Sequence, residues 1–270
     1  MCRLYGFCAN EPTKVECTLV HAQNALVAQS RSDLSGKTHS EGWGVVTFDD
    51  VGPQVERQAW AAYHGEHFHR AASRIYADIV IAHVRRATVG GAEINNTHPF
   101  VSGKWAFAHN GTVRNFDRVK KKILSEIAPD LKSSIKGQTD SEHIFYYVLS
   151  LIRREGASDL RAIIAQTIGD VDAWAREVDP KSVSGLNIIL TDGDRIAGSR
   201  FGRTLHYVER DGVYDCEICG FPHIHHEQAT RYRAFVVASE PLTHENWLEI
   251  PDRSLWEGAV SRPEISIRSF

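Results

Sequence analysis

The chain begins Met1-Cys2-Arg3-Leu4-Tyr5-Gly6, and this stretch decides the fold that we expect. Initiator methionine is normally removed when the next residue is small, and cysteine is small. Without Met1, the α-amine of Cys2 has a reference pKa of about 7.7 to 8.0 and lies beside a thiol with a reference pKa of about 8.5. One residue would then supply both a nucleophile and a base. The alternative interpretation is an ordinary thiol near a chain end.

The composition is that of a globular protein. Of the 270 residues, 42% are hydrophobic and 24% are charged, and we find no internal repeat or linker. We therefore expect a single domain over residues 1–270. A net charge of -3 provides no electrostatic attraction for nucleic acid or an anionic membrane, so we predict neither partner. The chain shows no signal peptide and no apolar run of the roughly 18 residues that span a bilayer, which predicts a cytoplasmic location.

Regular elements follow from the apolar patterns. Alternating or continuous apolar runs predict strands, and apolar residues at helical spacing predict helices. The expected strands are residues 3–9, 42–48, 79–88, 105–109, 186–190, 196–201, 205–208 and 234–238. The expected helices are residues 15–30, 60–76, 115–127, 139–152, 158–168 and 171–178.

Polar motifs follow several of these elements. The strand Ile79–Thr88 is apolar at first and becomes polar at its end, where site residues often lie. Asn110-Gly111 follows a strand and favours a turn with positive φ. In Thr139-Asp140-Ser141-Glu142, Thr139 or Asp140 is expected to cap the next helix, so that Asp140 has a structural interpretation as well as a functional one.

The order of the motifs is more specific than any one of them. Cys2 is followed by His83-Val84-Arg85-Arg86-Ala87-Thr88, Asn96-Thr97-His98-Pro99, His109-Asn110-Gly111 and Thr139-Asp140-Ser141-Glu142. This series resembles the glutaminase domain of class II glutamine amidotransferases, which are N-terminal-nucleophile hydrolases. Gly42-Trp43-Gly44, Ala238-Ser239-Glu240-Pro241-Leu242 and Trp247 are similar to the short stand-alone members. The resemblance implies an α+β fold, a four-layer αββα sandwich of two antiparallel sheets flanked by helices.

The resemblance also implies a role for each matching residue. Cys2 would attack the γ-amide of glutamine, and Asn110 with the N–H of Gly111 would form the oxyanion hole. Arg85 would bind the substrate α-carboxylate and Asp140 its α-ammonium. Ammonia would depart and leave a γ-glutamyl thioester. Two further residues match positions lining the substrate pocket of the family, Thr88 and His98, although His98 could instead hold its loop in place.

Physical chemistry agrees with these roles. Two preorganised donors aimed at a developing oxyanion stabilise the transition state, and the loss of one typically lowers the rate ~10² to 10³-fold. The planar guanidinium of Arg85 matches a carboxylate, and Asp140 has the charge opposite to an ammonium.

Two differences from the larger members of the family leave the identity of the substrate undetermined. Arg86 and Val89 stand where the sugar-synthesising relatives usually have an aromatic residue and a histidine. No second catalytic domain follows the glutaminase-like region, so a separate synthase could accept the ammonia in trans. The alternatives are hydrolysis of a glutathione-like or other γ-glutamyl compound, and a non-catalytic γ-glutamyl-binding subunit.

The cysteines raise a separate question. Five cysteines scattered through the chain do not form a disulfide framework. The stretch Cys216-Glu217-Ile218-Cys219-Gly220-Phe221-Pro222-His223-Ile224-His225-His226 could bind zinc, form a polar loop or act as a redox pair. We predict no cofactor from the sequence and assign no metal site.

Overall fold

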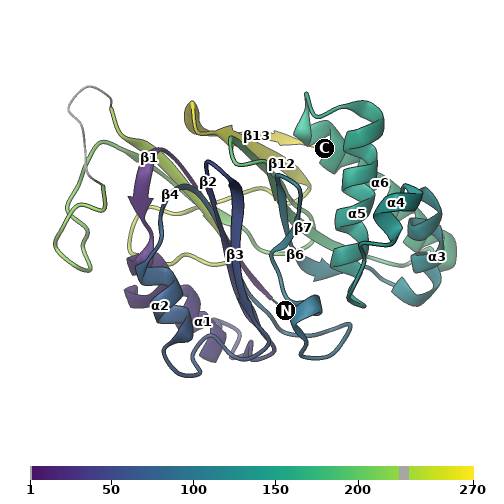
Figure 1. Ribbon diagram of the computed structural model, residues 1–270, viewed down its shortest axis with the longest axis horizontal. Helices are drawn as coiled ribbons and strands as arrows, with labels where there is room; N and C mark the ends of the chain where they lie inside the picture. The colour runs from purple at the N-terminus through teal and green to yellow at the C-terminus, as the bar shows by residue number, and fades with distance from the viewer. Residues whose placement is uncertain (1, 225–230) are drawn as a thin grey trace.

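The computed structural model describes residues 2–224 and 231–270. Two antiparallel sheets pack face to face, and helices cover the outer face of each sheet (Figure 1). This is the four-layer αββα sandwich that the sequence predicts.

The first sheet has β1 at its centre. In the described part of the chain its strand order is β11-β9-β10-β1-β4-β2-β3. The chain therefore enters the middle of the sheet at once, because Arg3 pairs with Val84 of β4 and Tyr5 with Ala238 of β10. The bounds are β1 Arg3–Lys14, β2 Trp43–Asp49, β3 Gly52–Gln58, β4 Tyr76–Val84, β9 His206–Asp211, β10 Arg233–Ala238 and β11 Leu248–Glu249.

The second sheet faces the first and carries β6. Its strand order is β13-β12-β8-β7-β6-β5. The short strand β5 pairs only with residues Trp105 to Phe107 of β6, so no strand of the described residues lies beside that edge of β6 from there to its end. The bounds are β5 Phe100–Ser102, β6 Trp105–Thr112, β7 Gly185–Thr191, β8 Arg195–Arg200, β12 Ser254–Ala259 and β13 Arg262–Ser269.

The helices form the two outer layers (Figure 1). A π-helical turn η1 and the helices α1 and α2 cover the β1 sheet, and the longer helices α5 and α6 cover the β6 sheet with α3 and α4 beside them. The bounds are η1 Cys17–His21, α1 Leu26–Arg31, α2 His67–Ser73, η2 Ile94–Asn96, α3 Phe116–Glu126, α4 Pro129–Lys132, α5 Asp140–Glu155 and α6 Leu160–Val178.

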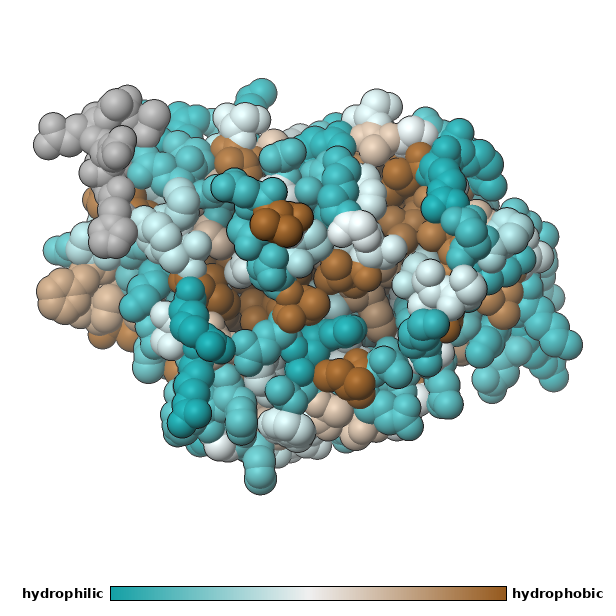
Figure 2. Space-filling view, viewed as in Figure 1, coloured by the Kyte–Doolittle hydropathy of each residue, from teal (hydrophilic) through white to brown (hydrophobic). Residues whose placement is uncertain are grey.

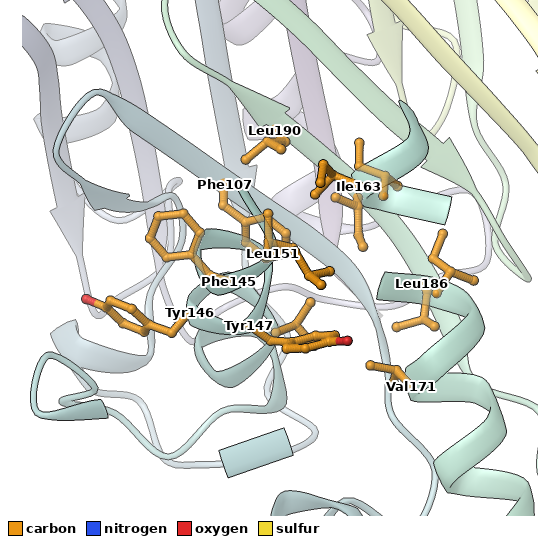
Figure 3. Close-up of a cluster of buried hydrophobic side chains, with 14 of the residues drawn as sticks. Phe107, Phe145, Tyr146, Tyr147, Leu151, Ile163, Val171, Leu186 and Leu190 are labelled. Carbon is orange, nitrogen blue, oxygen red and sulfur yellow. The ribbon is translucent and has the colours of Figure 1, made fainter. Parts of the chain in front are cut away.

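Three apolar cores lie between the four layers. The inner core joins the two sheets and includes the fully buried Trp256. One outer core packs α1 and α2 against β1, and the other packs α5 and α6 against β6 and β7. In the latter, Phe107 and Phe145 stack with their ring centroids 5.4 Å apart (Figure 3). Burial of large aromatic side chains on both faces of each sheet holds the sheets at fixed separation.

The face shown in Figure 2 is mainly hydrophilic, and its hydrophobic residues form separate small groups. No helix among the described residues combines the length and the apolar character that crossing a membrane requires.

Several predicted elements need correction. The helix expected over residues 15–30 is a π-helical turn followed by the separate α1, and the helix expected over 60–76 is reduced to α2. The two helices expected between residues 158 and 178 are one continuous helix, α6, in which Gly169 is an exposed interior residue. The hairpin β12–β13 was not predicted at all.

Asn110-Gly111 is also not a turn, since both residues lie within β6 opposite Asn187 and Leu186. Glycine is required here for space. A Cβ on Gly111 would collide with the carbonyl of Gly185 in β7 and lie 2.7 Å from Nε2 of His109. Close packing of β6 against β7 therefore explains the glycine of this dipeptide, and the turn predicted from the Asn-Gly sequence is wrong.

Candidate active site

Cys2 precedes the central strand and lies against the segment that follows β4. Its Sγ is 3.4 Å from the backbone nitrogen and 3.3 Å from the backbone oxygen of Arg86. Burial raises the pKa of the Cys2 thiol, while the Arg86 contact and the Arg85 guanidinium lower it and the Asp140 carboxylate raises it. Arg85 and Asp140 are thus close enough to act electrostatically on the sulfur.

Arg85 is the first residue after β4, and it is 2% exposed. Its guanidinium donates to the carbonyl of Gly91 at 2.8 Å through Nη1, and to those of Val89 and Gly90 at 2.8 and 3.2 Å through Nη2. Residues 89–91 therefore fold around the guanidinium. A bound carboxylate would take the place of some of these carbonyl contacts, so these residues would have to move.

Asn110 is buried, and its side chain is held by Ser239. Nδ2 of Asn110 lies 3.3 Å from Oγ of Ser239, while Oδ1 has no hydrogen-bond partner in the described structure. Ser239 Oγ also accepts the backbone N–H of Leu4 at 2.9 Å. One hydroxyl thus links the amide of Asn110 to the start of β1, two residues from Cys2.

The N–H of Gly111 faces the open edge of β6. Leu186, opposite Gly111, directs its own N–H to the carbonyl of Phe201 and its carbonyl to Ser199, on the other side of β7. In an antiparallel ladder such a pair exchanges no hydrogen bonds, so the N–H of Gly111 points away from β7. Since β5 pairs only with Trp105 to Phe107, no described strand accepts this N–H.

Asp140 begins α5, and the preceding Thr139 caps the helix by accepting the N–H of Glu142 at 3.2 Å. The carboxylate of Asp140 accepts the N–H of Val113 at 2.8 Å and that of Ser141 at 2.8 Å. Oδ1 also accepts the hydroxyl of Ser141 at 3.3 Å. Asp140 therefore connects the end of β6 to α5, and Oδ2 keeps a lone pair for another donor.

The other two predicted residues lie in different surroundings. Thr88 is exposed, and its hydroxyl is 3.1 Å from that of Thr112 at the end of β6. His98 is 3% exposed, and its ring lies 4.2 Å from the ring of His83 and 4.7 Å from that of Phe100. A Cβ on Gly44 would collide with the backbone carbonyl of His98, so the glycine in β2 lets this loop lie on the sheet.

Sequence reasoning missed the ion pairs that support the cysteine. Arg3 donates to the carbonyl of Cys2 at 3.1 Å, and its guanidinium pairs with the buried carboxylates of Asp33 and Glu240. Asp33 in turn contacts His39 at 3.0 Å. The available signal in the sequence is Arg3, a charged residue directly after Cys2 in a stretch predicted to be a strand, whereas Ser239 and Glu240 belong to a motif that only the family resemblance singles out.

An αββα sandwich whose central strand starts directly after a cysteine has the fold of the N-terminal-nucleophile hydrolases. The chain belongs to the class II glutamine amidotransferases, because the model of that family matches residues 1–262. A probable glutamine amidotransferase of Saccharomyces cerevisiae is 26% identical, covering 94% of this chain and 81% of the relative. The γ-glutamyl-hercynylcysteine sulfoxide hydrolase of Mycobacterium tuberculosis is 28% identical, covering 95% of this chain and 92% of the relative.

Solved structures share the fold. A glutamine aminotransferase class-II domain protein from Silicibacter pomeroyi superimposes with a TM-score of 0.64 at 20% identity, over 99% of this chain and 98% of the other. The glutamine phosphoribosylpyrophosphate amidotransferase of B. subtilis gives a TM-score of 0.63 at 17% identity, over 99% of this chain and 49% of that longer chain.

Proposed function

We propose that the protein releases ammonia from the γ-amide of glutamine, with Cys2 as the nucleophile after removal of Met1, a residue outside the described part of the chain. Sγ forms a bond to the amide carbon, the C–N bond breaks, and the α-amine returns the thiol proton to the leaving nitrogen. Water then cleaves the thioester to give glutamate and the free thiol.

The observation that carries this proposal is that contacts connect Cys2 to two sets of predicted site residues. In the first set, the backbone of Arg86 contacts Sγ of Cys2 directly, and Arg85 immediately precedes Arg86 in the chain. In the second set, Ser239 links the strand that follows Cys2 to Asn110. The N–H of Gly111 points to the open edge of β6 and has no partner among the described residues. Asn110 Nδ2 and the N–H of Gly111 would stabilise the oxyanion.

Arg85 and Asp140 would bind the amino-acid end of the substrate. When residues 89–91 release the guanidinium, its fork of N–H donors is free for an α-carboxylate. Asp140 keeps its contacts to Val113 and Ser141 and accepts the α-ammonium through the remaining lone pair of Oδ2. Thr88 and His98 remain candidates for substrate contact or for support of the loop.

The decisive experiment offers glutamine, glutathione and other γ-glutamyl compounds to the wild type and to Cys2→Ala and measures released ammonia and glutamate. We expect turnover by the wild type alone. Equal turnover by both proteins would remove Cys2 from the mechanism. A glutamine analogue carrying a diazoketone should label Cys2 and leave the other cysteines unmodified, and mass spectrometry of the intact protein reports whether Met1 is removed.

A second candidate is hydrolysis of a larger γ-glutamyl compound. It is favoured by the similarity to the M. tuberculosis hydrolase and by Arg86 and Val89, which replace the aromatic residue and histidine usual in sugar-synthesising relatives. A higher kcat/KM for such a compound than for glutamine would select it. Turnover of glutamine would instead favour delivery of ammonia to a separate synthase, and no turnover with retained Met1 would favour a non-catalytic binding subunit.

A further inference from the structure

Three cysteines and a histidine meet at the end of β1 opposite to Cys2. Cys17 is the first residue of η1, three residues after the end of β1, whereas Cys216, Cys219 and His223 lie in the connection from β9 to β10. One ligand atom from each of these four residues lies within 4.8 Å of those from the other three. We call these four residues the Cys17 cluster, and we propose that it binds a structural zinc ion.

The spacing of the ligand atoms suits a tetrahedral ion. Zn–S bonds of about 2.3 Å and Zn–N bonds of about 2.0 Å place ligand atoms about 3.5 to 3.8 Å apart. Sγ of Cys219 lies 3.3 Å from Nε2 of His223, and the limit of 4.8 Å leaves only small side-chain movements for the rest. Three thiolates and one imidazole form a closed set that is typical of structural zinc.

The backbone between the two later cysteines already has the form that a thiolate needs. The N–H of Ile218 points at Sγ of Cys216 from 3.4 Å, and the N–H of Gly220 donates to the carbonyl of Cys216 at 2.8 Å. Gly220 has a φ of +74°, a conformation that favours glycine. N–H groups directed at a ligating sulfur stabilise its charged form and fix its orientation.

The connection is also held in position beside Cys17. The N–H of Lys14 at the end of β1 donates to the carbonyl of His223 at 2.9 Å, and Glu217 accepts the N–H of His244 at 3.2 Å. Ile218 and Ile224 pack against the core between the β1 sheet and its helices. The four ligands are therefore brought together by the fold rather than by one mobile loop.

The length of the connection supports a structural role. Residues 212–232 join two strands, and their described part contains no helix or strand. Loops longer than about 12 to 15 residues are uncommon in compact domains unless something orders them. Tyr214 and Phe221 are 72% and 71% exposed, so these side chains contribute little apolar burial there. A zinc ion would fix this connection to β1 and η1.

An entry path for the ion is present. A cavity of about 270 Å³ is lined by Cys17, Cys216 and His223, with Arg210 and Glu245 on its wall. Cys219 is exposed. His225 and His226, which the sequence also offered as ligands, lie outside the described residues and are not part of the proposed site.

The first test is the metal content of protein prepared without a histidine tag and under reducing conditions. We expect one zinc ion per chain by mass spectrometry of the metal. Replacement of zinc by cobalt should give thiolate-to-cobalt charge-transfer absorption and the intense visible bands of a tetrahedral centre. Folded protein that contains no zinc and shows neither feature on addition of cobalt would overturn the proposal.

Cys17→Ser is the decisive variant, because Cys17 comes from a different part of the chain than the other three ligands. We expect it to lose zinc and to lower the temperature of unfolding. Cys8→Ala and His64→Ala, which change a buried cysteine and an exposed histidine outside the cluster, should keep the full zinc content. Full zinc content in Cys17→Ser would contradict the cluster.

Cys219→Ser controls for misfolding, since an exposed side chain leaves no cavity in the core when it is exchanged. This variant should keep the circular dichroism of the wild type and bind zinc at least tenfold more weakly, because even changes to residues that only orient the ligands typically weaken metal binding 10- to 100-fold. Wild-type affinity in Cys219→Ser would reject Cys219 as a ligand and the four-residue site with it. A chelator should lower the unfolding temperature of the wild type, and zinc should restore it.

Discussion

The backbone nitrogen of Arg86 lies 3.4 Å from Sγ of Cys2, so the segment after β4 contacts the sulfur directly. Arg85 precedes this contact and carries the guanidinium that lowers the pKa of Cys2, while the carboxylate of Asp140 raises that pKa. The two proposed anchors of the substrate zwitterion therefore act in opposite directions on the nucleophile.

The rate at which Cys2 is alkylated should report the effects of Arg85 and Asp140 on its pKa independently of turnover. At a fixed pH below the pKa of Cys2, the thiolate fraction rises when that pKa falls. Asp140→Asn should therefore speed the alkylation of Cys2 by iodoacetamide a few-fold, and Arg85→Gln should slow it, although both variants lose turnover. The rates are measured at Cys2 by peptide mass spectrometry. Asp130→Asn, which changes a surface carboxylate, serves as the control, and slower alkylation in Asp140→Asn would contradict the assignment.

Ser239 should act as a positioning residue for Asn110. Its hydroxyl contacts Nδ2 of Asn110 and accepts the N–H of Leu4, so Ser239→Ala releases the amide and leaves a buried N–H without a partner. We expect kcat to fall about tenfold with KM nearly unchanged, because an oxyanion donor acts mainly in the transition state.

Ser254→Ala is the matched control for that variant. Ser254 is also buried, but its hydroxyl has no hydrogen-bond partner in the described structure. Steady-state kinetics should show the fall in kcat for Ser239→Ala alone. A rise in KM without a fall in kcat would assign Ser239 to substrate binding instead.

Gly111→Ala should lose both stability and activity. The added methyl group would collide with the carbonyl of Gly185 and press on His109, which moves β6 relative to β7. We expect about 1 to 3 kcal/mol less stability from this overpacking and at least ~10²-fold lower turnover from the displaced oxyanion donor.

Gly169→Ala provides the opposite expectation for the same chemical change. Gly169 is exposed within α6, and a Cβ there meets no atom within 4 Å. Alanine should stabilise the helix by about 0.5 to 1 kcal/mol without changing turnover. Denaturant unfolding and kinetics of both variants check the pair, and a neutral Gly111→Ala would show that β6 tolerates the methyl group.

The sequence predicts the four layers because its motifs follow strands whose order the family resemblance supplies, and the roles of the site residues stay predictions of that resemblance. Local patterns fail where tertiary packing decides. Asn110-Gly111 has strong turn preference, yet close approach to Gly185 explains its glycine. The pairing of Arg3 with Asp33 and Glu240, and the meeting of Cys17 with Cys216, join residues far apart in the chain. Spacing in the sequence does not predict contacts between residues so far apart in the chain, because only the fold places them side by side.

The buried ion pairs behind Cys2 should make stability depend on pH. His39 is fully buried beside Asp33, and burial with the nearby Arg3 lowers its pKa to about 4, below the ordinary value of 6.5. Between these two pH values, His39 therefore binds a proton in the unfolded chain and does not bind one in the folded chain. Stability is complete above about pH 6.5 and is lost as the pH falls toward about 4, by roughly 3 kcal/mol from this group. The lowered pKa of Asp33 continues the loss at more acidic pH.

Denaturant unfolding of the wild type, His39→Gln and His64→Gln between about pH 7.5 and about pH 4.5 measures this contribution. Other buried histidines, including His83 and His98, also have lowered pKa values, so some acid sensitivity must remain in every variant. The slope of stability against pH should become shallower in His39→Gln and stay unchanged in His64→Gln, because His64 is exposed. Identical slopes in all three proteins would mean that His39 is protonated equally in the folded and unfolded chains, and its proposed neutral contact with Asp33 would be wrong.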